Sequence, residues 1–246
     1  MKDLFSGQAH LYSQFRPTYP PELYEHILQF VPGRKSALDC ATGNGQVARA
    51  LALHFERVCA IDISRRQLEH ATNAGNIDYS LSPAEKTPFP DSSFDLITVA
   101  QAYHWIDGRS FCSEATRIAR PGAVVAIWGY DLSTDGSSVN AILRRWNFET
   151  LAPYWEKERT HIYTHYRDLP FDFEPLPVRD FEIAVDWDFD HLVGHLNTWS
   201  ALPNIVNEKG ETPFRQTVDE IRRVWGKNEK KRFIFPVFMK LGRVLK

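Results

Sequence analysis

Two glycines between an apolar run and an amphipathic run form the segment of this sequence best suited to hold a ligand. Gly43 and Gly45 follow the apolar run 36–40, and a helical pattern begins directly after them. Glycine allows such a turn because it adopts positive φ angles, and it leaves bare backbone against which a ligand can lie. Asp62 ends the next apolar run, where its carboxylate can accept hydrogen bonds from the two hydroxyls of a ribose. These features predict a site for a nucleoside-containing cofactor.

Two kinds of cofactor fit this glycine turn. The spacing of Gly43, Gly45 and Ala48, with an acidic residue about 20 positions further on, satisfies the fingerprint of nicotinamide dinucleotides. Asp39 argues against that interpretation, because a carboxylate just before the glycines repels a pyrophosphate and favours a cationic group. Two alternatives therefore remain: a nicotinamide-dependent oxidoreductase, and an enzyme whose cofactor carries a positive charge near Asp39.

A polar and aromatic segment, 101–105, follows the strongest apolar run, 94–100. Open sheets of parallel strands bind ligands beyond the carboxyl ends of their strands, so we expect this segment at a site. His104 is a candidate general base or hydrogen-bond donor, and the rings of Tyr103 and Trp105 suit a nearby positive charge. The alternative is that His104 caps the following helix and Trp105 belongs to the core.

Neither metal binding nor disulfide chemistry is indicated. Two histidine pairs have the i, i+4 spacing of a helix, His161/His165 and His191/His195. Neither pair has the HExxH arrangement, and no cysteine or carboxylate set completes a site, so we interpret all four as surface or packing histidines. The three cysteines are an odd number without a CxxC spacing, which favours packing roles in a reducing compartment.

The composition of the 246-residue chain is that of an ordinary globular protein, with 43% apolar and 24% charged residues. The chain has 29 Lys and Arg against 31 Asp and Glu, a net charge of −2 that gives no basic excess for nucleic acid or an anionic membrane. The longest apolar runs, such as 123–128, are far shorter than the ~20 residues of a membrane-spanning helix, and no signal peptide opens the chain. We therefore expect a cytoplasmic protein without nucleic-acid or membrane partners.

Apolar runs alternate with amphipathic runs through the first half of the chain. The patterns predict strands at 36–40, 58–61, 77–81, 94–100 and 123–128, and helices at 46–55, 65–72 and 107–119. Pro121 and Gly122 are expected to stop the last of these helices. Such alternation requires parallel strands joined by right-handed crossovers, with helices on both faces. The predicted fold is α/β, a doubly wound, mostly parallel sheet.

The pattern changes after Tyr130. A polar link leads to a helical region rich in Trp, Tyr and Arg, and further elements are predicted as a strand at 181–189, helices at 191–201 and 214–225, and a β-prone tail at 232–245. We expect these helices to form a cap over the carboxyl ends of the strands. The predicted division is an N-terminal lid and cofactor-binding core, 1–132, the cap with the strand near 181–189, 133–230, and a closing edge strand of the sheet, 231–246.

The glycine turn and the later segment 83–95 together resemble the class I S-adenosylmethionine-dependent methyltransferases, whose fold is Rossmann-like. Ala41 stands where their loop usually has a glycine. Three other parts of the chain are similar to a small-molecule subgroup with a methyltransferase type 11 domain, the trans-aconitate methyltransferase-like proteins. These parts are 94–107, 198–201, and an N-terminal segment with Phe5, Tyr12 and 15–20.

The resemblance implies S-adenosylmethionine as the cofactor and assigns residues to each part of it. The methionine and ribose would contact Asp39, Ala41, Gly43 and Gly45. The ribose and adenine would contact Asp62, Ile63, Ala84 and Glu85. Ala100 and Gln101 would lie near the sulfonium, while Tyr12 and Arg16 would close over the cofactor, with Arg16 pairing with its carboxylate. The candidate catalytic residues are Tyr103, His104 and Trp105.

The acceptor is expected to be a small molecule. The place after 94–100 lacks the Asn/Asp-Pro-Pro-aromatic motif of amino-methylating nucleic-acid enzymes. Arg144, Arg145 and Arg215, set among the aromatic residues of the predicted cap, favour an anionic acceptor such as a carboxylic acid. A carboxylate is ionised near neutral pH and needs no base, whereas a hydroxyl, amine or carbon acid would give His104 that role. A non-catalytic nucleoside-cofactor-binding protein is the remaining alternative.

Overall fold

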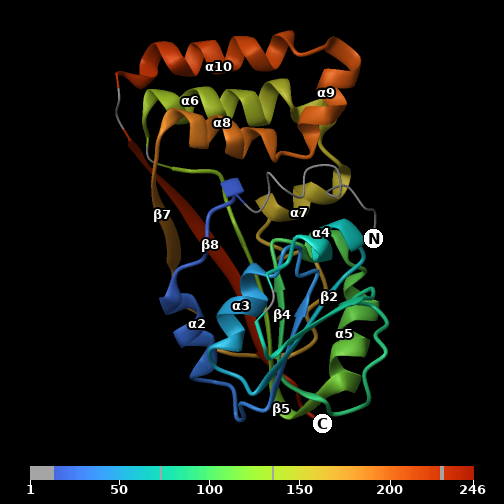
Figure 1. Ribbon diagram of the computed structural model, residues 1–246. Helices are drawn as coiled ribbons and strands as arrows, with labels where there is room; N and C mark the ends of the chain where they lie inside the picture. Colours follow the sequence, from blue (N-terminus) through green and yellow to red (C-terminus); the bar gives the residue numbers. More distant parts are fainter. Residues whose placement is uncertain (1–13, 73, 135, 228–229) are drawn as a thin grey trace.

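A twisted sheet runs through the centre of the fold (Figure 1). The structure is a computed structural model, and it describes residues 14–72, 74–134, 136–227 and 230–246 of the chain. The sheet has eight strands in the order β3-β2-β1-β4-β5-β8-β6, and β7 also pairs with β8. The strands are β1 (Ser36–Cys40), β2 (Arg57–Asp62), β3 (Ile77–Leu81), β4 (Phe94–Ala100), β5 (Ala119–Tyr130), β6 (Glu174–Pro175), β7 (Phe181–Trp187) and β8 (Lys231–Arg243). The first five strands are parallel, and every pairing of β8 is antiparallel.

Helices cover both faces of the parallel strands because successive strand residues point to opposite faces. Ala37 belongs to the core beneath α2 and α3, whereas its neighbour Leu38 belongs to the core beneath α5. The helices of this half are α2 (Pro21–Leu28), α3 (Gln46–Ala52), α4 (Arg65–Glu69) and α5 (Gly108–Ile118), with a 3₁₀ turn, η2 (Tyr103–Trp105). The prediction of a doubly wound, mostly parallel α/β sheet is confirmed.

The second half of the chain forms a helical cap beyond the carboxyl ends of the parallel strands (Figure 1). It contains α6 (Ser138–Arg145), a π-helix, η3 (Trp146–Thr150), the 3₁₀ turns η4 (Ala152–Tyr154) and η5 (Lys157–Arg159), and the helices α7 (Thr160–Tyr163), α8 (Phe189–Asn197), α9 (Ala201–Lys209) and α10 (Thr212–Trp225). Tryptophans fill its core; Trp146, Trp199 and Trp225 are all at most 4% exposed. Within the described ranges, no helix is both long enough and apolar enough to cross a bilayer.

The C-terminal strand is not at the edge of the sheet, contrary to the sequence prediction. β8 pairs with β5 on one side, from Val124↔Arg243 to Tyr130↔Val237, and with β6 and β7 on the other. The tail looked like an edge because it is last in the sequence. However, its backbone pairs along both edges, and its alternate residues Phe233 and Phe235 are at most 3% exposed.

Pro121 and Gly122 also act differently from the prediction. The helix α5 ends earlier, at Ile118, and β5 begins at Ala119, so the two residues lie inside the strand. The pairing of β4 with β5 shifts register at this place, and Gly122 has a φ of +76°. A proline without an N–H donor is tolerated in a strand at such an irregularity.

Candidate active site

The turn between β1 and α3 has left-handed backbone at three places. Ala41, Gly43 and Gly45 have φ angles of +52°, +57° and +81°. Ala41 therefore adopts the conformation that a glycine would take more easily, which explains why its position usually holds glycine in the resembling family. Gly45 is the N-cap of α3, and a Cβ there would collide with the Tyr79 ring.

Asp62 organises the loops after β1 and β2. Its Oδ2 accepts a hydrogen bond from the backbone N–H of Gly43, and its Oδ1 accepts one from the N–H of Ser64, both at 2.8 Å. The side chain is at the carboxyl end of β2, and the residue is 8% exposed. A carboxylate oxygen accepts more than one hydrogen bond, so these contacts leave acceptor capacity for a ligand.

Asp39 is the most buried acid of the site, at 1% exposure. Its Oδ2 accepts a hydrogen bond from the Thr42 hydroxyl at 2.5 Å, and its Oδ1 accepts one from the Thr98 hydroxyl at 2.8 Å. Burial raises the pKa of Asp39 to about 7, although the two threonine hydrogen bonds lower it. A positive charge placed beside this carboxyl would favour its ionised form.

These loops line a first cavity of about 110 Å³ at the carboxyl ends of β1, β2 and β4. Eight of the predicted cofactor residues line it: Arg16, Asp39, Ala41, Gly43, Asp62, Ile63, Ala100 and Gln101. The sequence prediction missed further lining residues, among them Tyr19, Thr42, Asn44, Gln67 and Tyr130. Asn44 and Thr42 belong to the glycine turn itself and could have been predicted from it, whereas Tyr130 comes from a strand that follows much later.

Three of the predicted cofactor residues that the structure describes lie elsewhere. Gly45 faces Tyr79, as described above, and Ala84 is 3% exposed within the core on the α5 side. Glu85 accepts a hydrogen bond from the backbone N–H of Asp107 at 3.2 Å through Oε1 and does not line the first cavity. Tyr12 lies outside the described residues.

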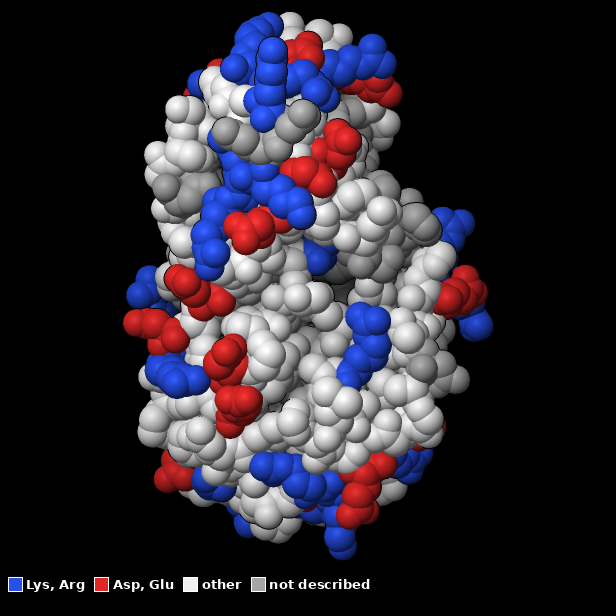
Figure 2. Space-filling view, turned by 60° about the vertical axis from the view of Figure 1, so that its left-hand side comes forward, with Lys and Arg blue, Asp and Glu red and all other residues white. Residues whose placement is uncertain are grey.

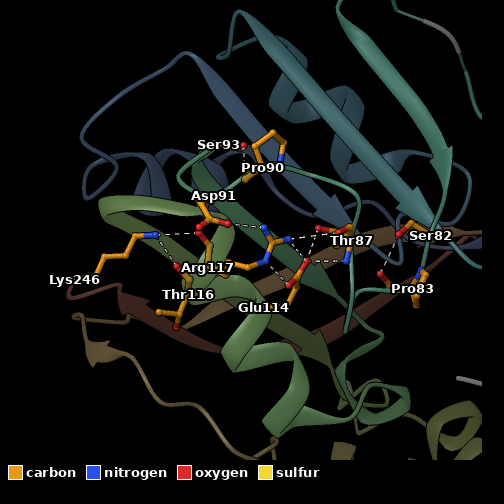
Figure 3. A network of polar contacts seen from close by, with 10 residues as sticks. All are labelled: Ser82, Pro83, Thr87, Pro90, Asp91, Ser93, Glu114, Thr116, Arg117 and Lys246. Atoms are coloured by element: carbon orange, nitrogen blue, oxygen red, sulfur yellow. Dashed lines mark hydrogen bonds and ion pairs between the residues drawn. The ribbon is translucent and has the colours of Figure 1, made fainter.

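A polar network holds the loop that carries Ala84 and Glu85 against α5 (Figure 3). The Glu114 carboxylate accepts hydrogen bonds from the N–H and hydroxyl of Thr87 at 2.7 and 2.6 Å, and Arg117 donates to Glu114 and to Asp91. Burial alone would raise the pKa of Glu114, but the hydrogen bonds from Arg117 and Thr87 outweigh it and hold the pKa at about 2. The loop is therefore fixed by interactions that need no ligand.

Gln101 joins the ends of β4 and β5 at the border of the first cavity. Its φ is +53°, and its Oε1 accepts a hydrogen bond from the Tyr130 N–H at 2.7 Å. Gly129 makes room for this contact, since a Cβ there would lie 2.8 Å from Gln101 Oε1 and 2.6 Å from the Phe238 ring. The backbone at this point is shaped by side chains from two strands.

A second cavity, of about 360 Å³, lies between the strand ends and the cap. It shares Arg16, Gln101, Trp105 and Tyr130 with the first cavity, so the two spaces adjoin. Its other walls are mostly aromatic or basic, including His104, Arg144, Phe148, Trp155, Arg159, Tyr163, Trp199 and Phe235. Figure 2 shows a face of the molecule that is hollowed at mid-height, between the cap and the sheet, with basic side chains beside the hollow.

The three candidate catalytic residues of the 3₁₀ turn have different environments. Trp105 lines both cavities and His104 lines the second. Tyr103 lines neither: it is fully buried against Phe111, and its hydroxyl donates to the carbonyl oxygen of Pro170. The structure therefore places Tyr103 in the core on the α5 side, apart from the other two residues of the turn.

His104 faces the second cavity as a neutral imidazole. Its Nδ1 is 3.0 Å from the Tyr166 hydroxyl, and the residue is 6% exposed. Burial lowers the pKa of His104 to about 3, and the positive charges of Arg159 and His161 lower it further. It does not cap the next helix, because the Asp107 side chain does so by accepting from the Ser110 N–H at 2.8 Å.

The arginines of the cap divide into two groups. Arg145 and Arg215, expected near the acceptor, instead pair with Glu220 and Glu211 outside both cavities. Arg144 does line the second cavity, together with Arg159. Sequence reasoning missed Arg159, which lies in a short polar turn that no periodic pattern marks.

Within the described part of the chain, no three metal-binding side chains come together. His161 contacts Asp168 at 2.7 Å, and His165 contacts Asp131 at 2.8 Å, so the first pair of histidines is divided between two carboxylates. His191 stacks on the Trp187 ring, and the His195 ring lies tilted against it.

A glycine turn, an acidic residue at the end of β2 and two adjoining cavities at the strand ends define an α/β enzyme that uses a nucleoside-containing cofactor. Comparison with known proteins narrows the class. Residues 38–127 match the methyltransferase domain family. A solved structure described as a type II methyltransferase, from Anaeromyxobacter dehalogenans, is 38% identical with a TM-score of 0.86, covering 94% of this chain and 99% of that one.

Two relatives found by sequence are also named as methyltransferases. A protein of Dictyostelium discoideum named as a methyltransferase is 29% identical over 98% of this chain and 95% of its own length. A Saccharomyces cerevisiae protein named as an S-adenosylmethionine-dependent methyltransferase is 30% identical over 50% of this chain and 45% of its own. The chain belongs to the class I S-adenosylmethionine-dependent methyltransferases. The oxidoreductase and the non-catalytic alternatives are thereby set aside, while the trans-aconitate subgroup stays a prediction.

Proposed function

We propose that this chain transfers a methyl group from S-adenosylmethionine, held in the first cavity, to a small-molecule carboxylic acid held in the second. The observation that carries the proposal is the border between the cavities. Arg16, Gln101, Trp105 and Tyr130 line both spaces, so a methyl donor in one and an acceptor in the other would meet there.

The donor groups of the first cavity fit S-adenosylmethionine. Asp62 keeps acceptor capacity for the ribose hydroxyls, and Asp39 offers a carboxyl to a cationic part of the cofactor. Arg16 donates to the Tyr130 hydroxyl at 2.8 Å and to the Thr198 carbonyl oxygen at 3.1 Å, which fixes its guanidinium at the border for the cofactor's carboxylate. When bound, the cofactor supplies an electrophilic methyl group on a sulfonium.

The residues of this chain then align the acceptor and exclude water. Transfer forms an O–CH₃ bond at the acceptor oxygen while the S–CH₃ bond breaks, and the electron pair of the broken bond stays on the sulfur. A carboxylate oxygen has no proton to lose, so no base is needed. Trp105 and Tyr130 provide the aromatic walls at the border, and neutral His104 can donate one hydrogen bond to orient the acid.

A small molecule fits this cavity better than a nucleic acid does. The volume of about 360 Å³ is within the range of small-molecule sites, and the net charge of −2 gives no general attraction to phosphate backbones.

The proposal is tested by methyl incorporation from labelled S-adenosylmethionine into a panel of carboxylic acids, phenols and amines. We expect acids to be methylated first. His104→Gln should then lower kcat by less than about tenfold, because removal of a true general base costs about 10²–10⁴-fold. His54→Gln, on an exposed turn after α3, is the matched control and should leave kcat unchanged. Methylation of amines or phenols alone, with a loss above about 10²-fold in His104→Gln, would contradict the proposed acceptor class.

A further inference from the structure

The two ring nitrogens of His104 have different surroundings. Nδ1 lies 3.0 Å from the Tyr166 hydroxyl, and Tyr166 is fully buried and lines neither cavity. The two rings lie nearly parallel, with centres 5.9 Å apart and an angle of 23° between their planes. His104 itself lines the second cavity, and none of the described residues forms a hydrogen bond with its Nε2. Nε2 is therefore the nitrogen that is left for a ligand.

Tyr166 lies in a turn after α7 whose backbone is strained. His165 and Tyr166 are consecutive residues with left-handed φ angles, +53° and +57°. Residues with a Cβ rarely adopt this conformation, and they keep it only where the surrounding structure holds them. Such strain occurs preferentially at functional sites, so the contacts that hold this turn indicate what it positions.

Contacts from β8 and from the 3₁₀ turn η2 hold this backbone in place. The Lys240 ammonium, on β8, donates to the carbonyl oxygens of Tyr166 and Leu169 at 2.7 and 2.9 Å. The Tyr166 ring packs edge-on against Phe238 of the same strand, with ring centres 5.0 Å apart, and against Tyr103 of η2 at 5.7 Å. The Tyr166 hydroxyl is thus fixed before any ligand binds.

The hydrogen bond between Tyr166 and His104 favours one direction. A phenol hydroxyl is a stronger acid than the N–H of a neutral imidazole, and a bare imidazole nitrogen is a stronger base than a phenol oxygen. Burial lowers the pKa of His104 to about 3, so its ring carries a single proton near neutral pH. When the Tyr166 hydroxyl donates to Nδ1, that single proton must lie on Nε2.

We propose that Tyr166 is a positioning residue, which donates to His104 Nδ1 and thereby keeps the imidazole proton on Nε2 as a hydrogen-bond donor to the second cavity. This inference rests on the proposed function and deepens it, because it decides what His104 does for the acceptor. In this tautomer His104 donates to an acceptor oxygen but has no lone pair in the cavity with which to remove a proton. The arrangement favours acceptors that are already ionised, such as carboxylates, over hydroxyls and carbon acids that need a base.

The tautomer of His104 is measured without turnover. Protein labelled with ¹⁵N-histidine is studied by NMR with and without S-adenosylhomocysteine, and His104→Ala identifies the His104 signals. We expect the chemical shift of a protonated nitrogen at Nε2 and of a bare nitrogen at Nδ1. In Tyr166→Phe, which keeps the ring but removes the hydroxyl, the two shifts should move toward each other as the tautomers mix. A proton on Nδ1 in the unchanged chain, or identical shifts in Tyr166→Phe, would overturn the proposal.

A double-mutant cycle separates positioning of His104 from a merely structural role. With the acid of the panel that has the highest kcat/KM, Tyr166→Phe should lower kcat/KM by about 3- to 10-fold, the scale of one lost hydrogen bond. In the His104→Ala background the same substitution should cost nothing further, because the side chain that Tyr166 positions is gone. A loss of the same size in the double variant would contradict the proposal and assign Tyr166 to the fold alone.

Tyr154→Phe is the matched control. The Tyr154 hydroxyl donates to Glu208 at 3.0 Å on the exposed side of the cap, and Tyr154 lines neither cavity. Its loss should change neither kcat/KM nor the shifts of His104. The affinity for S-adenosylhomocysteine should be equal in Tyr166→Phe and the unchanged chain, which reports correct folding.

The outcomes separate this inference from the proposed function. Failure of the unchanged chain to bind S-adenosylhomocysteine, or to methylate any acid of the panel, would overturn the proposed function. The NMR measurement on the cofactor-free protein would still decide which nitrogen of His104 carries the proton and whether Tyr166 sets it.

Discussion

Replacing Asp62 by asparagine should weaken cofactor binding and destabilise the chain by amounts that two measurements can separate. The Asp62 carboxylate accepts the N–H of Gly43 at one oxygen and the N–H of Ser64 at the other, each at 2.8 Å. An asparagine side chain has only one oxygen, so one of these N–H groups would face an NH₂ donor and lose its acceptor.

The magnitude follows from the loss of hydrogen bonds to a charged group. Each such bond contributes about 1.5–3 kcal/mol, so the free energy of unfolding should fall by about 2 kcal/mol. The same substitution removes one acceptor for a ribose hydroxyl. If the binding free energy of S-adenosylhomocysteine falls by about 2 kcal/mol, its Kd rises about 30-fold.

Calorimetric titration with S-adenosylhomocysteine gives the Kd, and urea denaturation of the cofactor-free protein gives the free energy of unfolding. Asp78→Asn is the control, because Asp78 pairs with Arg57 on an exposed surface and lines neither cavity. It should change neither quantity by much, as exposed ion pairs contribute little. A Kd within threefold of the unchanged chain in Asp62→Asn would refute the assignment of Asp62 to the ribose.

Two further predictions concern pH. Glu114 has a pKa lowered to about 2, so its contribution to stability is present above about pH 4.5 and is lost as the pH falls toward 2; Glu114→Gln should cost about 2 kcal/mol at pH 7 and nothing near pH 2, measured by denaturation at each pH. Asp39 has a pKa raised to about 7, so its contribution is present below about pH 4 and is lost as the pH rises through 7; Asp39→Asn should remove that decline in the cofactor-free protein, and a persisting decline would contradict it.

The parallel strands of the fold can be predicted from the sequence because they are buried on both faces of the sheet. Such strands appear as continuous apolar runs, and the runs at β1, β2 and β4 were located to within a residue at each end. The glycine turn is equally visible, since left-handed backbone restricts the residue type at Gly43 and Gly45.

The antiparallel part was less predictable. β7 shows the alternation of a half-buried strand and was recognised, but nothing within 231–246 indicates that β8 lies between β5 and β7. The place of a strand in the sheet depends on which strand edges the rest of the fold leaves unpaired. Those edges are set by residues throughout the chain, so the sequence of one strand does not reveal its neighbours.

The sequence by itself determined the loops of the first cavity, because Asp39, Gly43 and Asp62 lie on consecutive strand ends that parallel pairing necessarily brings together. Only the tertiary structure decided the second cavity. Arg159 and His104 come from segments far apart in sequence, and whether each faces the cavity depends on a 3₁₀ turn and on the packing of the cap. Arg144 and Arg145 are adjacent and chemically identical. Helical geometry directs Arg144 toward the second cavity and Arg145 toward Glu220. This difference cannot be predicted from the residue type alone.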